Sequence, residues 1–402
     1  RRAAVAPRRA LARAAGRRPL ASEAAGSAEA AAAGLGPGAS LGPNIRLSTE
    51  PVPRARAPWV PAALEPEQAP ASRRAAESVA PGAPYAKELR LLSHVFETAV
   101  PGDPVSVCRQ IESFGEDVLA HSGQWLKVAG AQKATVLKAA LSGVPPRGSI
   151  LEIGAYCGYS AIRMALAVPG TRIVTLEVDP AHVVIARNMV AFAGLAHMVD
   201  VWTGHSKDLL PRIPWRYGGP EHFKLCGVFM DQRGSRYEED LAVIERLGLL
   251  LPQSVVIADN VLKPGSPIFL WRLLSGDTYD TQIVRVREFA MPSEDWMSVS
   301  QLRRAFPAPE AAEEGAVPPE EARPRPPEEL EQLQWESDRI RAQATRAGQG
   351  VSFQAWAAYA EQMRERLAPW RVAATMDAAS LEEGAALFPR PLPAPEGPLP
   401  RR

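Results

Sequence analysis

Short apolar runs alternate with helical segments through the central part of the chain. The pattern predicts buried strands at residues 149–155, 172–178, 198–204, 226–231 and 254–260. Helical patterns separate these runs, and two further β-rich segments follow at 281–289 and 297–303. Strands that alternate with helices form a mainly parallel sheet covered by helices on both faces. We therefore expect an α/β fold built on a doubly wound, mainly parallel, seven-stranded sheet.

Helical periodicity also precedes the first predicted strand. Residues 86–100 predict a helix whose buried face comprises Leu89, Leu92, Val95 and Phe96. Asp103 is suited to cap the start of a second helix, and residues 131–143 predict a third. The ordered part of the chain is therefore expected to begin near residue 86.

The alternating pattern stops after Arg304. Residues 306–329 are rich in Pro and Glu and are typical of a linker. Residues 351–367 place Phe353, Trp356, Ala360, Met363 and Leu367 on one stripe of an amphipathic helix. We expect this helix to dock on the core rather than to bind a partner. The Pro-rich residues 389–402 are expected to be a solvated end, with an SH3-type ligand as the alternative.

Composition separates a globular centre from two biased flanks. Only 13 of the 39 prolines lie within residues 86–303, whereas all six histidines and all three cysteines lie there. We therefore expect a disordered Arg/Ala/Pro-rich region at 1–85, one folded domain at 86–303 and an extension at 304–402 that carries the linker, the helix and the tail. Three cysteines cannot form a disulfide framework, which favours a reducing compartment.

Charge and hydropathy exclude two classes of protein. Lys and Arg number 46 against 45 Asp and Glu, so a uniformly basic nucleic-acid binder is disfavoured. No apolar run reaches the roughly 20 residues of a membrane span, so we expect a soluble intracellular protein. Residues 1–22 hold seven arginines and no acid, which resembles a plastid or mitochondrial transit peptide. A basic disordered tail on a cytoplasmic protein is the alternative, and a nucleic-acid-binding arm is disfavoured because no aromatic residue is interleaved.

A glycine-containing turn joins the first predicted strand to its helix. Gly154 and Gly158 allow a tight turn that can lie against a ligand, and Ser160 can donate a hydrogen bond there. Their spacing is not the G-x-G-x-x-G of nicotinamide cofactors, which disfavours an NAD-dependent oxidoreductase. Glu177 ends the second strand, 25 residues after Glu152, where a carboxylate can hold both hydroxyls of a ribose. An acid on either side of such a turn is typical of S-adenosylmethionine (SAM) methyltransferases; a tight turn with a surface glutamate is the alternative.

Oxygen-bearing side chains follow the fourth and fifth predicted strands. Asp231 ends the fourth strand, and Asp259 and Asn260 end the fifth. Ligands of parallel sheets bind outside the carboxyl ends of the strands, so these side chains are expected to converge. Three oxygen donors without Cys or His suit Mg²⁺ rather than zinc. The alternative is that the Asp-Asn pair only forms a turn.

The central region resembles the catechol O-methyltransferase family. The segments that carry the resemblance are ILEIGAYCGYSAIRMA, PGDPVSV, GHSKDLLP, VFMD…RY and ADNVLKPGSPIFL, within about residues 86–303. The resemblance implies a Rossmann-like methyltransferase fold, SAM as methyl donor, and Mg²⁺-dependent methylation of a catechol or related phenol by direct displacement. It further implies a small-molecule acceptor and a monomer; a caffeoyl-coenzyme-A-type acceptor remains an alternative.

The same resemblance assigns roles by position. The implied cofactor-binding residues are Glu152, Gly154, Tyr156, Gly158, Ser160, Glu177, Ser206 and Asp231. The implied metal ligands are Asp231, Asp259 and Asn260. The implied substrate residues are Trp125, Pro264 and Glu288, of which Glu288 would hold the second hydroxyl.

The sequence departs from the family at one catalytic position. The family carries a base lysine three residues after the first metal aspartate, and this chain has Gly234 there. Glycine cannot accept a proton, so Lys263, Lys127 or Arg233 is required to replace it, or the metal acidifies the phenol by itself. The remaining alternative is a weakly active or inactive SAM-binding scaffold. We expect an active enzyme, with Lys263 and Glu288 as catalytic residues.

Overall fold

The computed structural model describes residues 83–119, 124–291, 293–303, 325–345 and 351–388. The transit-peptide interpretation of residues 1–22 and the tail predicted at 389–402 lie outside these ranges. Among the helices that are described, none combines the length and the apolar character needed to cross a bilayer.

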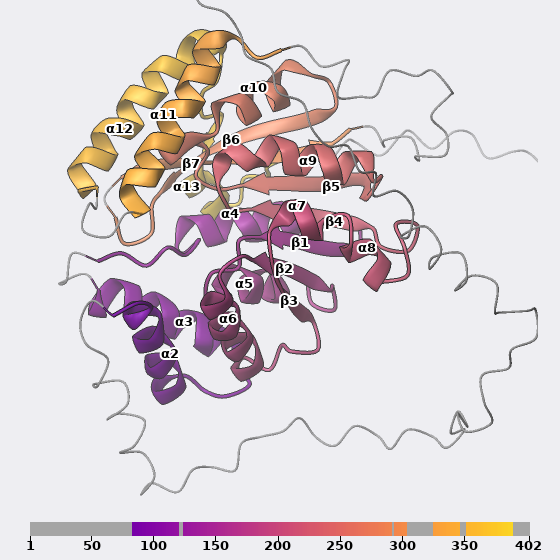
Figure 1. The fold of residues 1–402 in the computed structure, drawn as a ribbon, viewed down its shortest axis with the longest axis vertical. Helices are drawn as coiled ribbons and strands as arrows, with labels where there is room; N and C mark the ends of the chain where they lie inside the picture. The colour runs from indigo at the N-terminus through magenta and orange to yellow at the C-terminus, as the bar shows by residue number, and fades with distance from the viewer. Residues whose placement is uncertain (1–82, 120–123, 292, 304–324, 346–350, 389–402) are drawn as a thin grey trace, which may run out of the picture. The chain divides into compact units, whose positions relative to one another are not determined.

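The strands and helices follow the order that the sequence predicts for the centre of the chain (Figure 1). The strands are β1 (Ser149–Ile153), β2 (Ile173–Glu177), β3 (Val199–Thr203), β4 (Leu225–Met230), β5 (Leu250–Ala258), β6 (Tyr279–Arg287), β7 (Glu294–Leu302) and β8 (Met376–Asp377). The helices are α2 (Ala86–Thr98), α3 (Pro104–Ser113), α4 (Gln132–Leu141), α5 (Tyr159–Ala167), α6 (Pro180–Phe192), α7 (Ser206–Leu209), α8 (Ile213–Arg216), α9 (Tyr237–Arg246), α10 (Pro267–Ser275), α11 (Glu328–Thr345), α12 (Phe353–Leu367) and α13 (Ala378–Glu382). Short helical turns are η2 (Phe114–Val118), η4 (Gly234–Arg236), η5 (Val261–Gly265) and η7 (Ala368–Trp370).

One mixed sheet organises these elements, in the strand order β3-β2-β1-β4-β5-β7-β6-β8. Strands β1 to β5 pair in parallel, whereas β7 runs antiparallel to both β5 and β6. The predicted doubly wound, mainly parallel sheet is therefore confirmed. The predicted strand number is wrong by one, because the two-residue strand β8 from the C-terminal extension pairs with β6 and makes eight.

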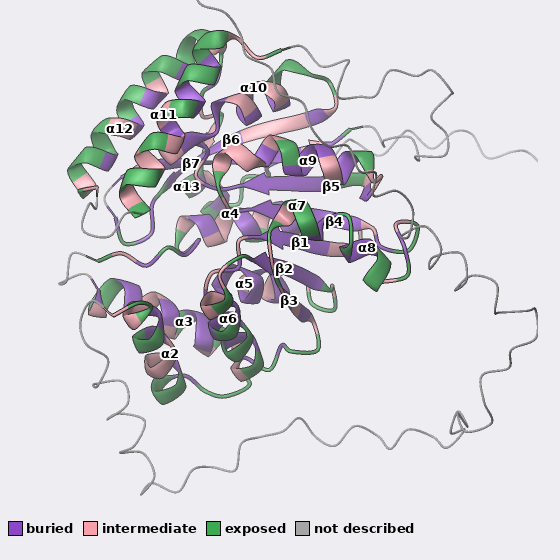
Figure 2. Ribbon diagram, viewed as in Figure 1, coloured by how far each residue is buried: buried purple, intermediate pink, exposed green. Residues whose placement is uncertain are grey.

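Helices cover both faces of the sheet because successive strand residues point in opposite directions. Ile150 and Ile173 pack into a core cluster with α2 to α6, whereas their neighbours Leu151 and Val174 pack into a second cluster with α7 and α9 to α12. Figure 2 shows the resulting buried strands between helices with exposed outer faces. Strand order reverses between β1 and β4, which is where ligands of such sheets bind.

The face predicted for helix α2 is right in part: Val95 is buried and Leu92 packs half-buried against the core, but the buried face is rotated toward Leu91 and Glu88. Leu91 and Val95 are buried with Glu88, whereas Leu89 and Phe96 are 41% and 43% exposed. A polar contact accounts for this orientation. The Glu88 carboxylate accepts a hydrogen bond of 2.6 Å from the Tyr156 hydroxyl, so the face of α2 that carries Glu88 lies against the turn after β1. The predicted cap of the next helix is confirmed, because Asp103 accepts hydrogen bonds from two backbone N–H groups of α3.

The C-terminal extension packs on the sheet domain. The predicted stripe of α12 is buried at Trp356, Ala360, Met363 and Leu367, and Phe353 is half-buried. Helix α12 contacts η5 and β7, and α11, which the sequence analysis did not predict, contacts α10 and η5 (Figure 1). The docking predicted for the amphipathic helix is therefore confirmed.

Candidate active site

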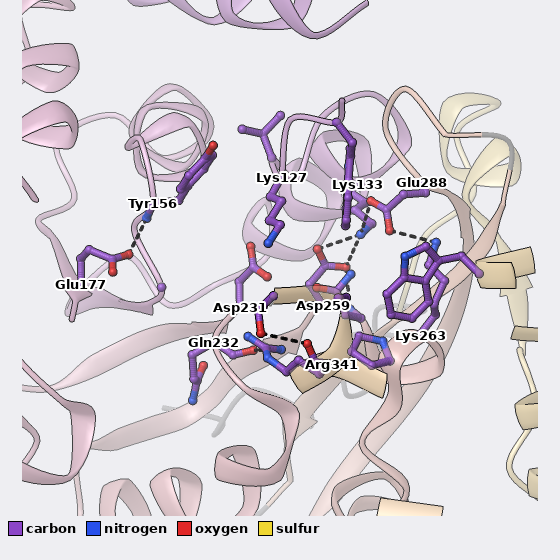
Figure 3. Close-up of a pocket in the computed structure, with 18 residues that line it drawn as sticks. Lys127, Lys133, Tyr156, Glu177, Asp231, Gln232, Asp259, Lys263, Glu288 and Arg341 are labelled. Carbon is purple, nitrogen blue, oxygen red and sulfur yellow. Dashed lines mark hydrogen bonds and ion pairs between the residues drawn. The ribbon is translucent and has the colours of Figure 1, made fainter. Parts of the chain in front are cut away.

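A pocket lies at the carboxyl ends of β1, β2, β4 and β5, and two helices of the extension complete its wall. Figure 3 shows its side chains, which point inward from both sides. The lining residues are Trp125, Lys127, Val128, Lys133, Gly154, Tyr156, Glu177, Asp231, Gln232, Asp259, Asn260, Lys263, Pro264, Glu288, Arg341, Ala344, Thr345 and Trp356.

The turn after β1 needs glycine for two physical reasons. Gly154 has a φ of +109°, and a Cβ there would lie 2.5 Å from the carbonyl oxygen of Asp231 at the end of β4. Gly158 has a φ of +85° at the start of α5. The tight turn is therefore confirmed, and the close approach of Gly154 is to the β4 backbone.

Glu177 is fixed and ionised at the end of β2. Its carboxylate accepts hydrogen bonds from the backbone N–H groups of Tyr156, at 2.8 Å, and Asp179, at 2.9 Å. Burial raises the pKa of Glu177, but the His182 side chain and the two N–H groups outweigh it and lower that pKa below its ordinary value. Glu177 therefore presents a negative charge to the pocket in a fixed orientation.

Four predicted cofactor residues are not part of the pocket wall. Glu152 is fully buried under the turn, where its carboxylate accepts a hydrogen bond from the Thr175 hydroxyl, and burial raises its pKa to about 7. Gly158 and Ser160 lie at the start of α5, and the Ser206 hydroxyl donates to Asp240 at 2.6 Å. The assignment of these four residues to the cofactor therefore stays a prediction.

The predicted oxygen donors do meet at one end of the pocket. Asp231, Asp259 and Asn260 all line it. Burial raises the pKa of Asp231 well above its ordinary value, and repulsion from Asp259 adds to the effect. Asn260 has a left-handed φ of 56°, and its Nδ2 donates to Asp295 at 2.8 Å, which leaves the amide oxygen for another partner. Within the described ranges no three His, Cys, Asp or Glu side chains cluster as a metal site, so the candidate set is two carboxylates and one amide.

A buried lysine neutralises the floor of the pocket. The Nζ of Lys133 on α4 lies 2.9 Å from a carboxylate oxygen of Asp259, 2.8 Å from Glu288 and 3.5 Å from Asp295. Burial lowers the pKa of Lys133, but the three carboxylates outweigh it and raise that pKa well above its ordinary value. Burial likewise disfavours the charged form of Glu288, but Lys133 and Lys263 lower its pKa to about 2. Sequence reasoning missed Lys133 and Asp295, because nothing local marks a lysine or an aspartate that is paired across the fold.

The structure separates the three side chains considered as replacements for the missing base lysine. Arg233 is exposed and pairs with Asp338 at 3.0 Å. The Lys263 ammonium donates to the Ser293 hydroxyl at 2.7 Å and lies 3.4 Å from Glu288. Lys127 lines the pocket and points toward Asp231 (Figure 3). Burial lowers the pKa of Lys127, and repulsion by Lys87 and Arg341 adds to the effect.

Comparisons with known proteins agree with this architecture. A family model described as O-methyltransferase matches residues 120–270. Catechol O-methyltransferase B of Danio rerio is 38% identical over 191 residues, which cover 47% of this chain and 69% of the relative. The chain belongs to the catechol O-methyltransferase family. Its fold is accordingly the Rossmann-like methyltransferase fold that the sequence predicted.

Other relatives of the catechol O-methyltransferase family match the same part of the chain. Catechol O-methyltransferase of Bos taurus is 40% identical over 185 residues, which cover 46% of this chain and 65% of the relative. The chain thus spans slightly less than two thirds of the length of that protein. A solved O-methyltransferase of Bacillus cereus in complex with SAH is similar at 20% identity and a TM-score of 0.40, over 58% of this chain and 97% of that one.

Proposed function

We propose that the chain is a SAM- and Mg²⁺-dependent O-methyltransferase that methylates one hydroxyl of a catechol-like small molecule. The observation that carries this proposal is the pocket itself. It joins an ionised acid at the end of β2 to an oxygen-donor set at the ends of β4 and β5, across the point where the strand order reverses. The relatives at 38% and 40% identity are catechol O-methyltransferases, which supports the same acceptor.

The cofactor side of the pocket suits SAM. Glu177 is held by two backbone N–H groups, so its remaining lone pairs are available to accept hydrogen bonds from the two hydroxyls of a ribose. Gly154 and Tyr156 line the pocket between Glu177 and Asp231, where the methionine end would lie. When bound, SAM supplies an electrophilic methyl group.

The residues at the ends of β4 and β5 suit Mg²⁺. Asp231 and Asp259 repel each other inside the wall of the pocket, and a divalent cation would relieve that repulsion. The amide oxygen of Asn260 supplies a third oxygen donor, which is the ligand type that Mg²⁺ prefers. When bound, the ion supplies Lewis acidity and a template for two adjacent hydroxyls.

The acceptor would be positioned by the chain's own side chains. Glu288 is ionised, so it can accept a hydrogen bond from the second hydroxyl of a catechol. Trp125 and Pro264 line the pocket and provide apolar surface for the ring. Holding both reactants at near-attack distance contributes roughly 7–11 kcal/mol to such a displacement. The proton of the attacked hydroxyl must leave, and Lys127 is the candidate acceptor that remains.

The test uses the purified full chain with labelled SAM, Mg²⁺ and two acceptors, catechol and phenol. We expect transfer to catechol and little to phenol, which has no second hydroxyl. Asp231→Asn is expected to abolish transfer, whereas Asp208→Asn, which changes an exposed carboxylate on α7, is the matched control. Equal transfer by the two variants would contradict the metal site, and SAM binding without transfer to any acceptor would support the scaffold alternative.

A further inference from the structure

The C-terminal extension forms part of the pocket wall. Arg341, Ala344 and Thr345 of α11 and Trp356 of α12 line the pocket together with the residues of the sheet domain. Leu330 and Leu333 of α11 and Met363 and Leu367 of α12 are buried in the same core cluster as β4 and β5. The extension is therefore packed against the site through an apolar interface.

Polar contacts fix the extension at the segments that carry the candidate metal ligands. The Tyr359 hydroxyl of α12 donates to the Pro264 carbonyl oxygen at 2.8 Å. The Nη1 of Arg341 donates to the carbonyl oxygen of Gln232, the residue after Asp231, at 3.2 Å (Figure 3). Arg341 is thus anchored beside Asp231 rather than free to swing into solvent.

The charged side chains of the pocket differ in whether they are paired. Asp259 and Glu288 are paired with Lys133, and Glu288 also lies near Lys263. Among the residues that the structure describes, Asp231, Lys127 and Arg341 form no ion pair within 4 Å. Of the four lysines and arginines that line the pocket, Lys133 and Lys263 therefore contact a carboxylate, whereas Lys127 and Arg341 contact none of those described.

Neighbouring arginines of the same region are already engaged elsewhere. Arg233 pairs with Asp338. Arg339, two residues before Arg341 on α11, is exposed, and its guanidinium lies 5.4 Å from the centroid of the Trp335 ring. The guanidinium of Arg341 differs from both, because it lines the pocket and donates one hydrogen bond to a backbone carbonyl. Its remaining N–H groups are available to a ligand.

We propose that Arg341 binds an anionic group on the acceptor, so that the preferred substrate is a catechol whose ring carries a carboxylate. This inference rests on the function proposed above and names the acceptor within it. A guanidinium presents parallel N–H donors that match the two oxygens of a carboxylate, which favours this anion over a neutral or cationic substituent. The extension would thereby set substrate preference, while the sheet domain holds the cofactor.

Steady-state kinetics of the full chain with two matched acceptors tests the inference. The acceptors are 3,4-dihydroxybenzoate and the neutral 3,4-dihydroxybenzamide. We expect the wild type to prefer the acid, and Arg341→Met to lower kcat/KM for the acid about tenfold or more, mainly through KM. The same variant is expected to change kcat/KM for the amide less than about twofold. Arg341→Lys should retain part of the preference, because lysine keeps the positive charge but lacks the paired N–H donors of the guanidinium.

Arg339→Met is the matched control, since it removes an arginine from the exposed side of the same helix. It should leave both acceptors unchanged. An equal loss on both acceptors in Arg341→Met would overturn the inference, because a structural role of Arg341 predicts that result. The absence of any preference for the acid in the wild type would overturn it as well.

Calorimetry separates failure of the inference from failure of the proposed function. Binding of the acid and the amide is measured with Mg²⁺ and S-adenosylhomocysteine present, in the wild type and in Arg341→Met. If the acid binds more tightly than the amide, this difference depends on Arg341 and no methyl transfer occurs, the anion site is supported and the proposed activity is contradicted. Methyl transfer to the amide together with equal binding of both compounds would support the proposed activity and contradict the anion site.

Discussion

Lys133 is the residue on which the buried charge balance of the pocket floor depends. Its side chain is 1% exposed, and its ammonium contacts Glu288, Asp259 and Asp295. Lys133→Met keeps an unbranched side chain of similar length and removes only the charge and its hydrogen bonds. The variant therefore leaves three buried carboxylates with one fewer cation among them.

The expected loss of stability is large because an unpaired buried charge is costly. Removing one partner of a buried ion pair typically costs about 3–5 kcal/mol. The apolar stem is retained in methionine, so little of this loss comes from packing. Whole domains are stable by only about 5–15 kcal/mol, so the variant should remain folded but lose a large share of its stability.

Urea unfolding at pH 7 measures this loss, with Lys138→Met as the matched control. Lys138 lies on the same helix, α4, and is exposed, so its substitution should stay within about 0.5 kcal/mol of the wild type. Adding Glu288→Gln to Lys133→Met should restore part of the stability, because one unpaired carboxylate is removed. A Lys133→Met variant as stable as Lys138→Met would refute the reasoning.

The pH dependence of the same variant checks the cause. The pKa of Glu288 is lowered from its ordinary 4.5 to about 2 by Lys133 and Lys263, against burial. A lowered pKa contributes stability that is present above 4.5 and is lost as the pH falls toward 2. The wild type should therefore lose stability over this window, and Lys133→Met should show a weaker dependence there.

Three further predictions concern residues in and around the pocket. Burial lowers the pKa of His182, but Glu177 outweighs it and raises that pKa above 6.5, so the pair stabilises the fold below pH 6.5 and this stabilisation is lost at higher pH. His182→Asn should therefore lower the free energy of unfolding in urea more at pH 6 than at pH 9. Equal losses at the two pH values would contradict the pair. Gly154→Ala should lower the melting temperature markedly because of its backbone clash, whereas Gly143→Ala, with no atom within 4 Å, should not. Tyr359→Phe should cost about 1 kcal/mol in chemical unfolding, and no change would show that its bond to the Pro264 carbonyl adds nothing.

The strand ends were predictable from the sequence because buried parallel strands leave a strong local signal. Each predicted strand of the centre overlaps an observed one, and the polar residue that follows an apolar run marks its carboxyl end. Glu177, Asp231, Asp259 and Asn260 line one pocket for that reason. The topology of such sheets then brings these ends together without any knowledge of side-chain contacts.

The partners across the fold were not predictable, because their signals are not local. Lys133 lies in a helix, where a lysine is normally solvent-facing, and only packing against β5 and β7 brings it to its acids. Arg341 follows a proline-rich stretch, and its helix has few apolar residues of its own. Strand β8 has two residues and is defined only by its pairing with β6. In each case the deciding interaction joins segments far apart in the sequence.

The residues proposed for the cofactor come from one stretch of the chain, whereas the acceptor side is assembled from several stretches, which include Trp125 and Glu288. Gly154, Tyr156 and Glu177 come from one continuous stretch around β1 and β2, whereas Pro264, Arg341 and Trp356 come from η5 and the extension packed on it. Helices α11 and α12 therefore lie mainly on the acceptor side, and Arg341 reaches the strand ends through its bond to the Gln232 carbonyl. Because Asp231 and Gly154 are in close backbone contact, a change at the strand ends would disturb both sides at once. Substitutions of the α11 residues that line the pocket are consequently expected to change acceptor preference in this protein more than cofactor affinity.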